Sequence, residues 1–166
     1  ASPRIAAVSW GIEDLSAAMG LPRTRDAEGR YLDIPRYARV MCAVAAAAAG
    51  VEALDTVYTD LADLEGLRRE CQEGVWMGFS GKISIHPSQI EPCNAAFSPS
   101  AEEIAEAGRI IGVFDLPENR DKGVVALDGR MVERLHLAMA RRTVAIAQAI
   151  EARRVEAHRV EAHGTD

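Results

Sequence analysis

Three short apolar segments, each followed by a helical pattern, constrain the fold of this chain more than any other feature. They are Arg4–Trp10, Ala53–Thr59 and Gly81–Ile85. Each has the length of a buried strand and is bounded by glycine, proline or polar residues. Strands that alternate with helices at this spacing form parallel βαβ units with right-handed crossovers. We therefore expect an α/β fold built on a parallel sheet.

The helices of these units have recognisable start and stop signals. The segment 34–50 has Pro35 near its first turn and Gly50 at its end, which is typical of a helix. A further helix is expected over Leu64–Met77, and the segment 87–97 predicts a short one after the third strand.

The last third of the chain is expected to be mainly helical. Ser100, with Glu103 three residues later, forms a capping box at a helix start. An extended stretch with a turn at Asp128 and Gly129 follows, and a final helix is expected to begin near Met131.

A parallel sheet of only three strands buries little surface and leaves two long edges unpaired. The 166 residues are enough for one domain with a hydrophobic core but too few for two. We therefore expect this chain to be part of something larger.

Composition excludes several classes of function. The net charge of −6 leaves no basic surplus to neutralise phosphates, so nucleic acid is not an expected partner. The alanine run 45–49 is too short to span a membrane, and no secretory signal pattern begins the chain. Cys42, Cys71 and Cys93 lack CxxC spacing, which favours reduced thiols in a cytoplasmic protein over a zinc site or disulfide framework.

The turn after the first expected strand is the first candidate site. Glu13 and Asp14 follow Gly11 at the carboxyl end of that strand, where parallel α/β proteins place their ligand sites. The Asp14 carboxylate suits a hard divalent cation such as Mg²⁺. Alternatively, both acids only favour a helix N-terminus through its dipole. The residues alone leave the two interpretations open.

Acidic residues in and after the second expected strand favour a structural role. Asp60, Asp63 and Glu65 are placed where helix caps commonly occur. Asp55 lies inside the strand, where a buried carboxylate needs a partner, and we interpret it as structural.

His86 follows the third expected strand, again at its carboxyl end. Its imidazole is placed to hydrogen-bond a substrate, and the turn at Pro87 leads into a helix whose amides attract anions. The alternative is a histidine that only satisfies loop backbone. Asp14 and His86 come from different strands but from the same end of one sheet, so we expect them to share a site.

Other patterns predict no chemistry. Neither a GxSxG nucleophile motif nor a Walker phosphate loop occurs. His158 and His163 of the repeated RVEAH pentapeptide are five residues apart and would diverge on a helix, so a metal clamp is not expected there.

Four stretches of the chain form a recognisable set: WGIEDLSAAMG, ALDTVYTDLADLEGL, EGVWMGFSGKISIHPSQI and AFSPSAEEIAEAGRII. Together they resemble the citrate lyase beta subunit-like acyl-CoA lyases of the HpcH/HpaI aldolase superfamily, a group that includes malyl-CoA and citramalyl-CoA lyases. The resemblance covers about residues 4–153. It implies a (β/α)₈ TIM barrel followed by a C-terminal helical lid segment.

On this resemblance, residues 1–116 are the last three βα units of the barrel. Residues 117–153 are the lid segment, and 154–166 are a helical or disordered tail. A complete barrel takes about 250 residues, so the first five strands are expected to lie outside this chain.

The resemblance also implies a site. Asp14 matches the aspartate that binds Mg²⁺, and the glutamate that completes the metal site would precede Ala1. The backbone of Glu13 and Asp14 would meet the substrate carboxylate. Ile85 and His86 would line the channel for the acyl-CoA thioester.

The lid of such lyases has an aspartate that reaches the active site of a neighbouring subunit, so a homo-oligomer, a trimer or hexamer, is implied. In the stretch DGRMVER, Glu133 stands at that catalytic position. Its side chain is one methylene longer than aspartate, and a shift of about 1 Å can cost on the order of a hundredfold in rate.

The implied activity is the reversible Claisen cleavage of a malyl-, citramalyl- or citryl-CoA-type 3-hydroxyacyl-CoA to acetyl-CoA and a 2-oxo acid. Two alternatives stay open. One is a malyl-CoA thioesterase, and the other is a non-catalytic half-barrel that lacks the N-terminal metal ligand.

Overall fold

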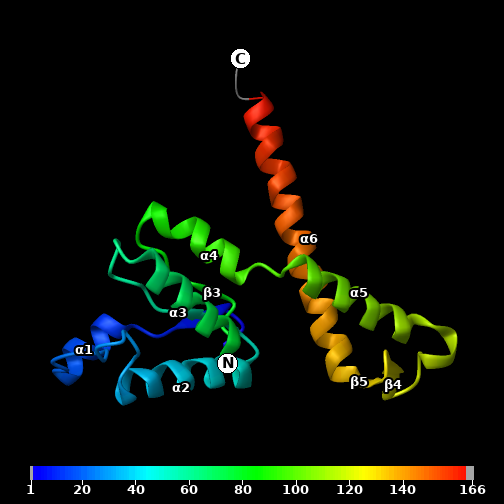
Figure 1. Cartoon of the computed structure of the whole chain (residues 1–166), viewed down its shortest axis with the longest axis horizontal. Helices are drawn as coiled ribbons and strands as arrows, with labels where there is room; N and C mark the ends of the chain where they lie inside the picture. Colours follow the sequence, from blue (N-terminus) through cyan, green and yellow to red (C-terminus); the bar gives the residue numbers. More distant parts are fainter. Residues whose placement is uncertain (1, 164–166) are drawn as a thin grey trace. The chain divides into compact units, whose positions relative to one another are not determined.

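The computed structural model describes residues 2–163 and divides into two compact units, Ala1–Phe97 and Ser98–Asp166 (Figure 1). The first unit contains β1 (Ala7–Ser9), α1 (Ile12–Met19), α2 (Asp33–Ala49), β2 (Glu52–Asp55), α3 (Leu64–Trp76), β3 (Gly81–Lys82), the 3₁₀ turn η1 (Pro87–Gln89) and α4 (Ile90–Phe97). The second unit contains α5 (Ala101–Asp115), the 3₁₀ turn η2 (Pro117–Asn119), β4 (Val124–Leu127), β5 (Arg130–Glu133) and α6 (Arg134–His163). The expected partition at residues 116 and 153 stays a prediction.

The first unit is built on a parallel sheet with the strand order β1–β2–β3, so the predicted mixed α/β class with a parallel sheet is confirmed. In the register, Ser9 lies opposite Leu54, and Asp55 lies opposite Lys82. All three strands are shorter than predicted. A ladder extends only as far as its partner, and β2, the central strand, ends at Asp55. The segments that follow the strands therefore begin close to one end of the sheet.

The core of the first unit lies between the sheet and its helices. Trp10, Ile12, Ala53 and Phe79 are buried together with Ala46 of α2. The alanine-rich sequence of α2 lets the helix backbone approach the strands closely. Gly50 ends this helix in the left-handed region, at φ 66°, as the sequence predicts. A second cluster, of Leu67, Cys71 and Cys93, joins α3 to α4.

The second unit has its own core, in which α5 and α6 pack against a β4–β5 hairpin. The predicted turn is confirmed, because Asp128 and Gly129 both have positive φ, 49° and 75°, as a two-residue hairpin turn requires. The capping box is also confirmed: Ser100 Oγ accepts from the Glu103 amide, and Glu103 Oε2 accepts from the Ser100 amide.

The predicted start of the final helix near Met131 is wrong. Residues 130–133 pair with β4 as β5, so α6 begins only at Arg134. α6 then continues into the expected tail as far as His163. Residues 164–166 and the side chains of the two tail histidines lie outside the described part. Within residues 2–163, no helix has both the length and the apolar character needed to span a membrane.

Candidate functional site

Asp14 lies in the first turn of α1, directly after β1. Its side chain is exposed, and within residues 2–163 it makes no hydrogen bond or ion pair. Gly11 allows this placement, because a Cβ at that position would lie 2.9 Å from Asp14 Oδ2. The amides of Glu13 and Asp14 also have no acceptor in the described part of the chain, as is usual for the first turn of a helix. The turn therefore offers a carboxylate and two amide donors.

Two hydrogen bonds to residues at the end of β2 hold this turn in place. The Ile12 amide donates to Thr56 Oγ1 at 3.2 Å, and Trp10 Nε1 donates to Asp55 Oδ1 at 2.8 Å. Both bonds are buried and join residues more than forty positions apart. Thr56 and Asp55 thus set the position of the chain on either side of Gly11.

Asp55 belongs to a buried charge network between the sheet and α2 and α3. Arg39 Nη2 donates to Asp55 Oδ2 at 2.7 Å, and Lys82 Nζ lies 3.6 Å from the same oxygen. Lys82 also donates to Glu70 at 2.7 Å, and Tyr31 donates to Glu70 at 3.1 Å. The side chains of Asp55 and Lys82 are fully buried. The predicted structural role of Asp55 is consistent with this network.

These partners keep Asp55 ionised. Burial alone would raise its pKa, but the charges of Lys82 and Arg39, with hydrogen bonds from Arg39 and Trp10, hold the pKa below its usual range. Paired buried charges of this kind destabilise a fold strongly when one partner is removed.

His86 lies in the segment between β3 and η1. Its Nδ1 accepts from the Ser88 amide at 3.2 Å and lies 2.8 Å from Ser88 Oγ, so the imidazole caps η1. The side chain is exposed, as is that of Ile85. His86 therefore has the loop-capping role that was one of the two alternatives, and its side chain is also exposed.

Gln89 organises the loops around His86. Its buried side-chain oxygen accepts from the Ile85 amide at 2.9 Å, and its Nε2 donates to the Tyr58 carbonyl at 2.7 Å. One side chain thus joins the segment after β3 to the segment after β2. No sequence pattern predicted this role of Gln89.

Parallel pairing brings the candidate segments to one end of the sheet. Asp14 follows β1, and His86 follows β3, each beyond the carboxyl end of its strand. No group of three or more potential metal-ligating acids, histidines or cysteines occurs among the described residues. Asp14 is therefore not part of such a group.

A sequence model of the HpcH/HpaI aldolase/citrate lyase family matches residues 1–87, which include β1 to β3 and the turns after them.

The chain belongs to the HpcH/HpaI aldolase/citrate lyase family.

Named relatives of this family member differ in activity. A (3S)-malyl-CoA thioesterase of Cereibacter sphaeroides is 42% identical over 92% of this chain and 52% of its own length. The human mitochondrial citramalyl-CoA lyase is 39% identical over 87% of this chain and 41% of its own length. The crystal structure of Mycobacterium tuberculosis CitE in complex with magnesium, acetoacetate and coenzyme A is 36% identical, with a TM-score of 0.71 over 84% of this chain and 51% of that one. The chain therefore spans about half the length of these relatives.

Glu133 of this HpcH/HpaI family member lies in the second unit. It is the last residue of β5 and is exposed, and its amide donates to Nδ1 of His136 at 2.9 Å. Its role, like the roles of Glu13, Asp14, Ile85 and His86, stays a prediction.

Several residues that hold the site of this HpcH/HpaI member were not selected from the sequence. Thr56, Gln89 and Lys82 act through contacts between segments that are distant along the chain. One signal was available: a lysine and an aspartate within neighbouring apolar strands, each needing a partner of opposite charge.

Proposed function

We propose that the full-length protein to which this chain belongs is a Mg²⁺-dependent acyl-CoA lyase. It would cleave a 3-hydroxyacyl-CoA of the malyl-, citramalyl- or citryl-CoA type to acetyl-CoA and a 2-oxo acid. The observation that carries the proposal is the unpaired Asp14 carboxylate, held over Gly11 beyond the carboxyl end of β1. The relative crystallised with magnesium, acetoacetate and coenzyme A supports it.

The sheet fits the last three βα units of a (β/α)₈ barrel, with residues 117–153 as the lid segment and the rest of the barrel supplied by a preceding segment. Sites of such barrels lie at the carboxyl ends of the strands. Asp14 and His86 follow β1 and β3 at that end.

The residues of the β1–α1 turn fit a magnesium ion. Mg²⁺ prefers oxygen ligands and is commonly held by one or two carboxylates together with waters and substrate oxygens. Asp14 would supply one such carboxylate. When bound, the ion would act as a Lewis acid on the substrate oxygens.

The remaining roles follow from the contacts of each residue. The amides of Glu13 and Asp14, at the positive end of α1, would bind the substrate carboxylate. The exposed side chains of Ile85 and His86 would line the path of the acyl-CoA thioester. Glu133 would act as the acid of the lid, reaching the site of a neighbouring subunit in a homo-oligomer.

The test compares two proteins, this chain and a version extended upstream by a segment that supplies the other five proposed βα units. Malyl-CoA and citramalyl-CoA are supplied with Mg²⁺, and the release of 2-oxo acid and acetyl-CoA is measured. Activity in the extended protein alone supports the proposal. If neither protein releases a 2-oxo acid, the lyase assignment is wrong.

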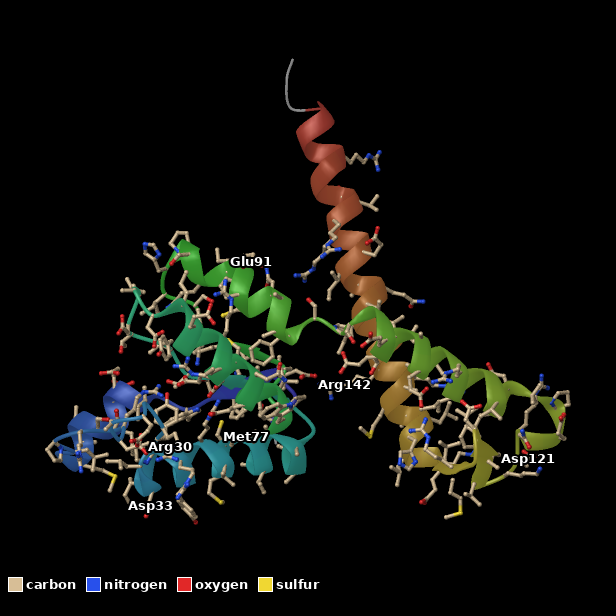
Figure 2. The ribbon with its side chains drawn as sticks, viewed as in Figure 1. Arg30, Asp33, Met77, Glu91, Asp121 and Arg142 are labelled. Atoms are coloured by element: carbon tan, nitrogen blue, oxygen red, sulfur yellow. The ribbon has the colours of Figure 1, made fainter. Side chains whose placement is uncertain are left out.

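Asp14→Asn in the extended protein should lower the affinity for Mg²⁺ by at least about tenfold to a hundredfold, since the loss of groups outside the ligand shell already costs that much. Titration with Mn²⁺ followed by electron paramagnetic resonance measures the affinity directly. Asp33→Asn is the matched control, because Asp33 is an exposed acid in the first turn of α2 (Figure 2). Equal affinities in the two variants would reject the role of Asp14.

A second candidate, a malyl-CoA thioesterase, is favoured by the 42% identity to the relative of that name. Hydrolysis of malyl-CoA releases malate and free coenzyme A, whereas cleavage releases glyoxylate and acetyl-CoA. The products of the same assay therefore distinguish the two. Absence of both reactions, even in the extended protein, would favour the non-catalytic alternative.

A further inference from the structure

Two thiols face each other between α3 and α4. The Sγ atoms of Cys71 and Cys93 lie 3.8 Å apart, and both residues are buried, with exposed fractions of 0% and 6%. Figure 2 marks the two helices: Met77 follows the end of α3, and Glu91 lies in the first turn of α4. Because the helices are packed together, their sulfur atoms are held near each other in the native fold.

The surroundings of Cys93 favour its thiolate. Ser84 Oγ donates to Cys93 Sγ at 3.5 Å, and the fully buried side chain of Lys82 adds a positive charge nearby. The hydrogen-bonding contact with Cys71, together with these two groups, outweighs the effect of burial and lowers the pKa of Cys93 to about 6. The pKa of Cys71 is raised, by its hydrogen bond to Cys93 and by burial. Cys93 is therefore suited to react first as a thiolate, and Cys71 is suited to react with the oxidised Cys93 in a second step.

On the side of Cys93, the pair is in contact with an exposed residue. Ser84 is exposed, and its hydroxyl contacts Cys93 directly. Cys42, in contrast, lies on α2 and belongs to the other core cluster, and burial raises its pKa. The chain thus contains an internal comparison for thiol reactivity.

We propose that Cys71 and Cys93 are a redox modification site that forms an intramolecular disulfide on reaction with a hydroperoxide. The Cys93 thiolate attacks the O–O bond, takes up one oxygen as a sulfenic acid and releases the other, which is protonated to water when the oxidant is H₂O₂. Cys71 then attacks the Cys93 sulfur, the S–S bond forms, and the second oxygen leaves as water. Two thiols and one H₂O₂ give one disulfide and two waters, so atoms and electrons balance.

The required movement is small. A disulfide bond is about 2.05 Å long, so the sulfur atoms must approach by roughly 1.8 Å. Side-chain rotation of either cysteine moves its sulfur on this scale. The reaction does not depend on the proposed lyase activity.

Peptide mapping of the whole chain tests the proposal. The native chain is treated with stoichiometric H₂O₂, the remaining thiols are alkylated, and the protein is digested with trypsin. Cleavage at arginine and lysine separates the three cysteines into peptides 40–68, 70–82 and 83–109. We expect a 70–82/83–109 linked pair that is more abundant than any linkage through Cys42 by at least about tenfold, because the native fold gives the pair a high effective concentration.

Variants separate this outcome from random oxidation. Cys42→Ser should keep the linked pair, and Cys93→Ser should lose it. Ser84→Ala should slow its formation several-fold, because the thiolate of Cys93 loses a donor. Peptide mapping of the oxidised chain without substitutions tests the proposal by itself, even if a cysteine variant folds poorly.

Three results would overturn the proposal. In the first, Cys71 and Cys93 stay alkylatable after oxidation while Cys42 is consumed. In the second, Cys93 ends as sulfinic acid without a linked pair. In the third, the linkage pattern equals that of chain oxidised in urea, where pairing is random.

Discussion

Thr56 supports the candidate metal turn through its side chain. Its hydroxyl oxygen accepts a hydrogen bond from the buried Ile12 amide at the start of α1. This amide lies outside the strands, so backbone pairing in the sheet does not satisfy it. If the Ile12 amide is buried without a hydrogen-bond acceptor, the folded state is destabilised by the desolvation of that amide. The turn that contains Asp14 also loses a contact that holds it in position.

Thr56→Val should lower the free energy of unfolding by about 1–3 kcal/mol. Hydrogen exchange at the Ile12 amide should accelerate at the same time. Thr56→Ser, which keeps the oxygen, is the control and should exchange nearly as slowly as the parent. Unchanged exchange at Ile12 in Thr56→Val would show that the hydroxyl does not hold the turn.

Asp55 makes stability dependent on pH. Its pKa is lower in the folded chain than in the unfolded chain, where it is about 3.9. Its contribution is therefore fully present above pH 4 and is lost as the pH falls through the folded-state pKa. Urea unfolding at pH 7 and near pH 3 should show a fall in stability on acidification.

Removal of one network charge should be costly at neutral pH. Asp55→Asn leaves Arg39 and Lys82 without their shared carboxylate and should lower the free energy of unfolding by about 3–5 kcal/mol. The variant should also lose much of the acid dependence. An acid dependence equal to that of the parent would assign it to other carboxylates.

At the scale of single residues, charge patterns predicted some partners but not others. Asp55 was interpreted as structural because a carboxylate in an apolar strand needs a partner. The identity of that partner depended on α2 and β3 folding over it, which periodicity does not reveal. The same holds for Gln89, whose two bonds join separate loops.

At the scale of the elements, helix ends are set by nearby residues in the sequence. They are therefore easier to predict than contacts between distant segments. The α5 capping box lies at the residues where the sequence places it. Ser100→Ala should destabilise the second unit by about 1 kcal/mol, because the Glu103 amide loses its acceptor.

Thermal unfolding followed by circular dichroism measures this change. Ser100→Thr retains the hydroxyl and should restore most of the stability. A midpoint that does not move in Ser100→Ala would mean that the second unit does not depend on this cap.

Strand lengths and the start of α6 were less predictable. An apolar sequence pattern can be longer than the strand that forms, because a strand ends where its hydrogen-bonded neighbour ends. β2, for example, ends at Asp55. Likewise, residues 130–133 are compatible with a helix and become β5 because β4 lies opposite. Both errors arise from pairing between segments.

At the scale of the whole chain, the first unit exposes several large apolar side chains. Ile5 is half exposed next to β1, which lies at one edge of the sheet. On α2, Tyr37, Met41 and Val44 form an exposed stripe at helical spacing. Such surface favours association of isolated chains.

This 166-residue chain, studied alone, should therefore dimerise or aggregate, which light scattering measures. Val44→Lys should reduce association, because it places a charge in the stripe. Gln72→Lys adds the same charge to an exposed polar position of α3 and is the control. A monodisperse monomer with cooperative unfolding would contradict this expectation.

The family and the α/β class were accessible from the sequence because motifs and strand–helix alternation are local. The excess of apolar surface was also anticipated, since three parallel strands leave their edges unpaired. Whether Glu133 acts together with the other candidate residues stays a prediction, because no local pattern encodes contacts between distant segments.

The opposition of Asp55 and Lys82 has a further consequence for how β3 finds its place. With only two residues, β3 has too few ladder bonds to reject a neighbouring alignment. A slip of one residue would turn the lysine ammonium to the opposite face and remove the cation that Asp55 and Glu70 share, leaving Arg39 and Arg25 as their partners. The ion pairs of Lys82 thus favour one register of β3. The position of the loop that ends in His86 depends on that register.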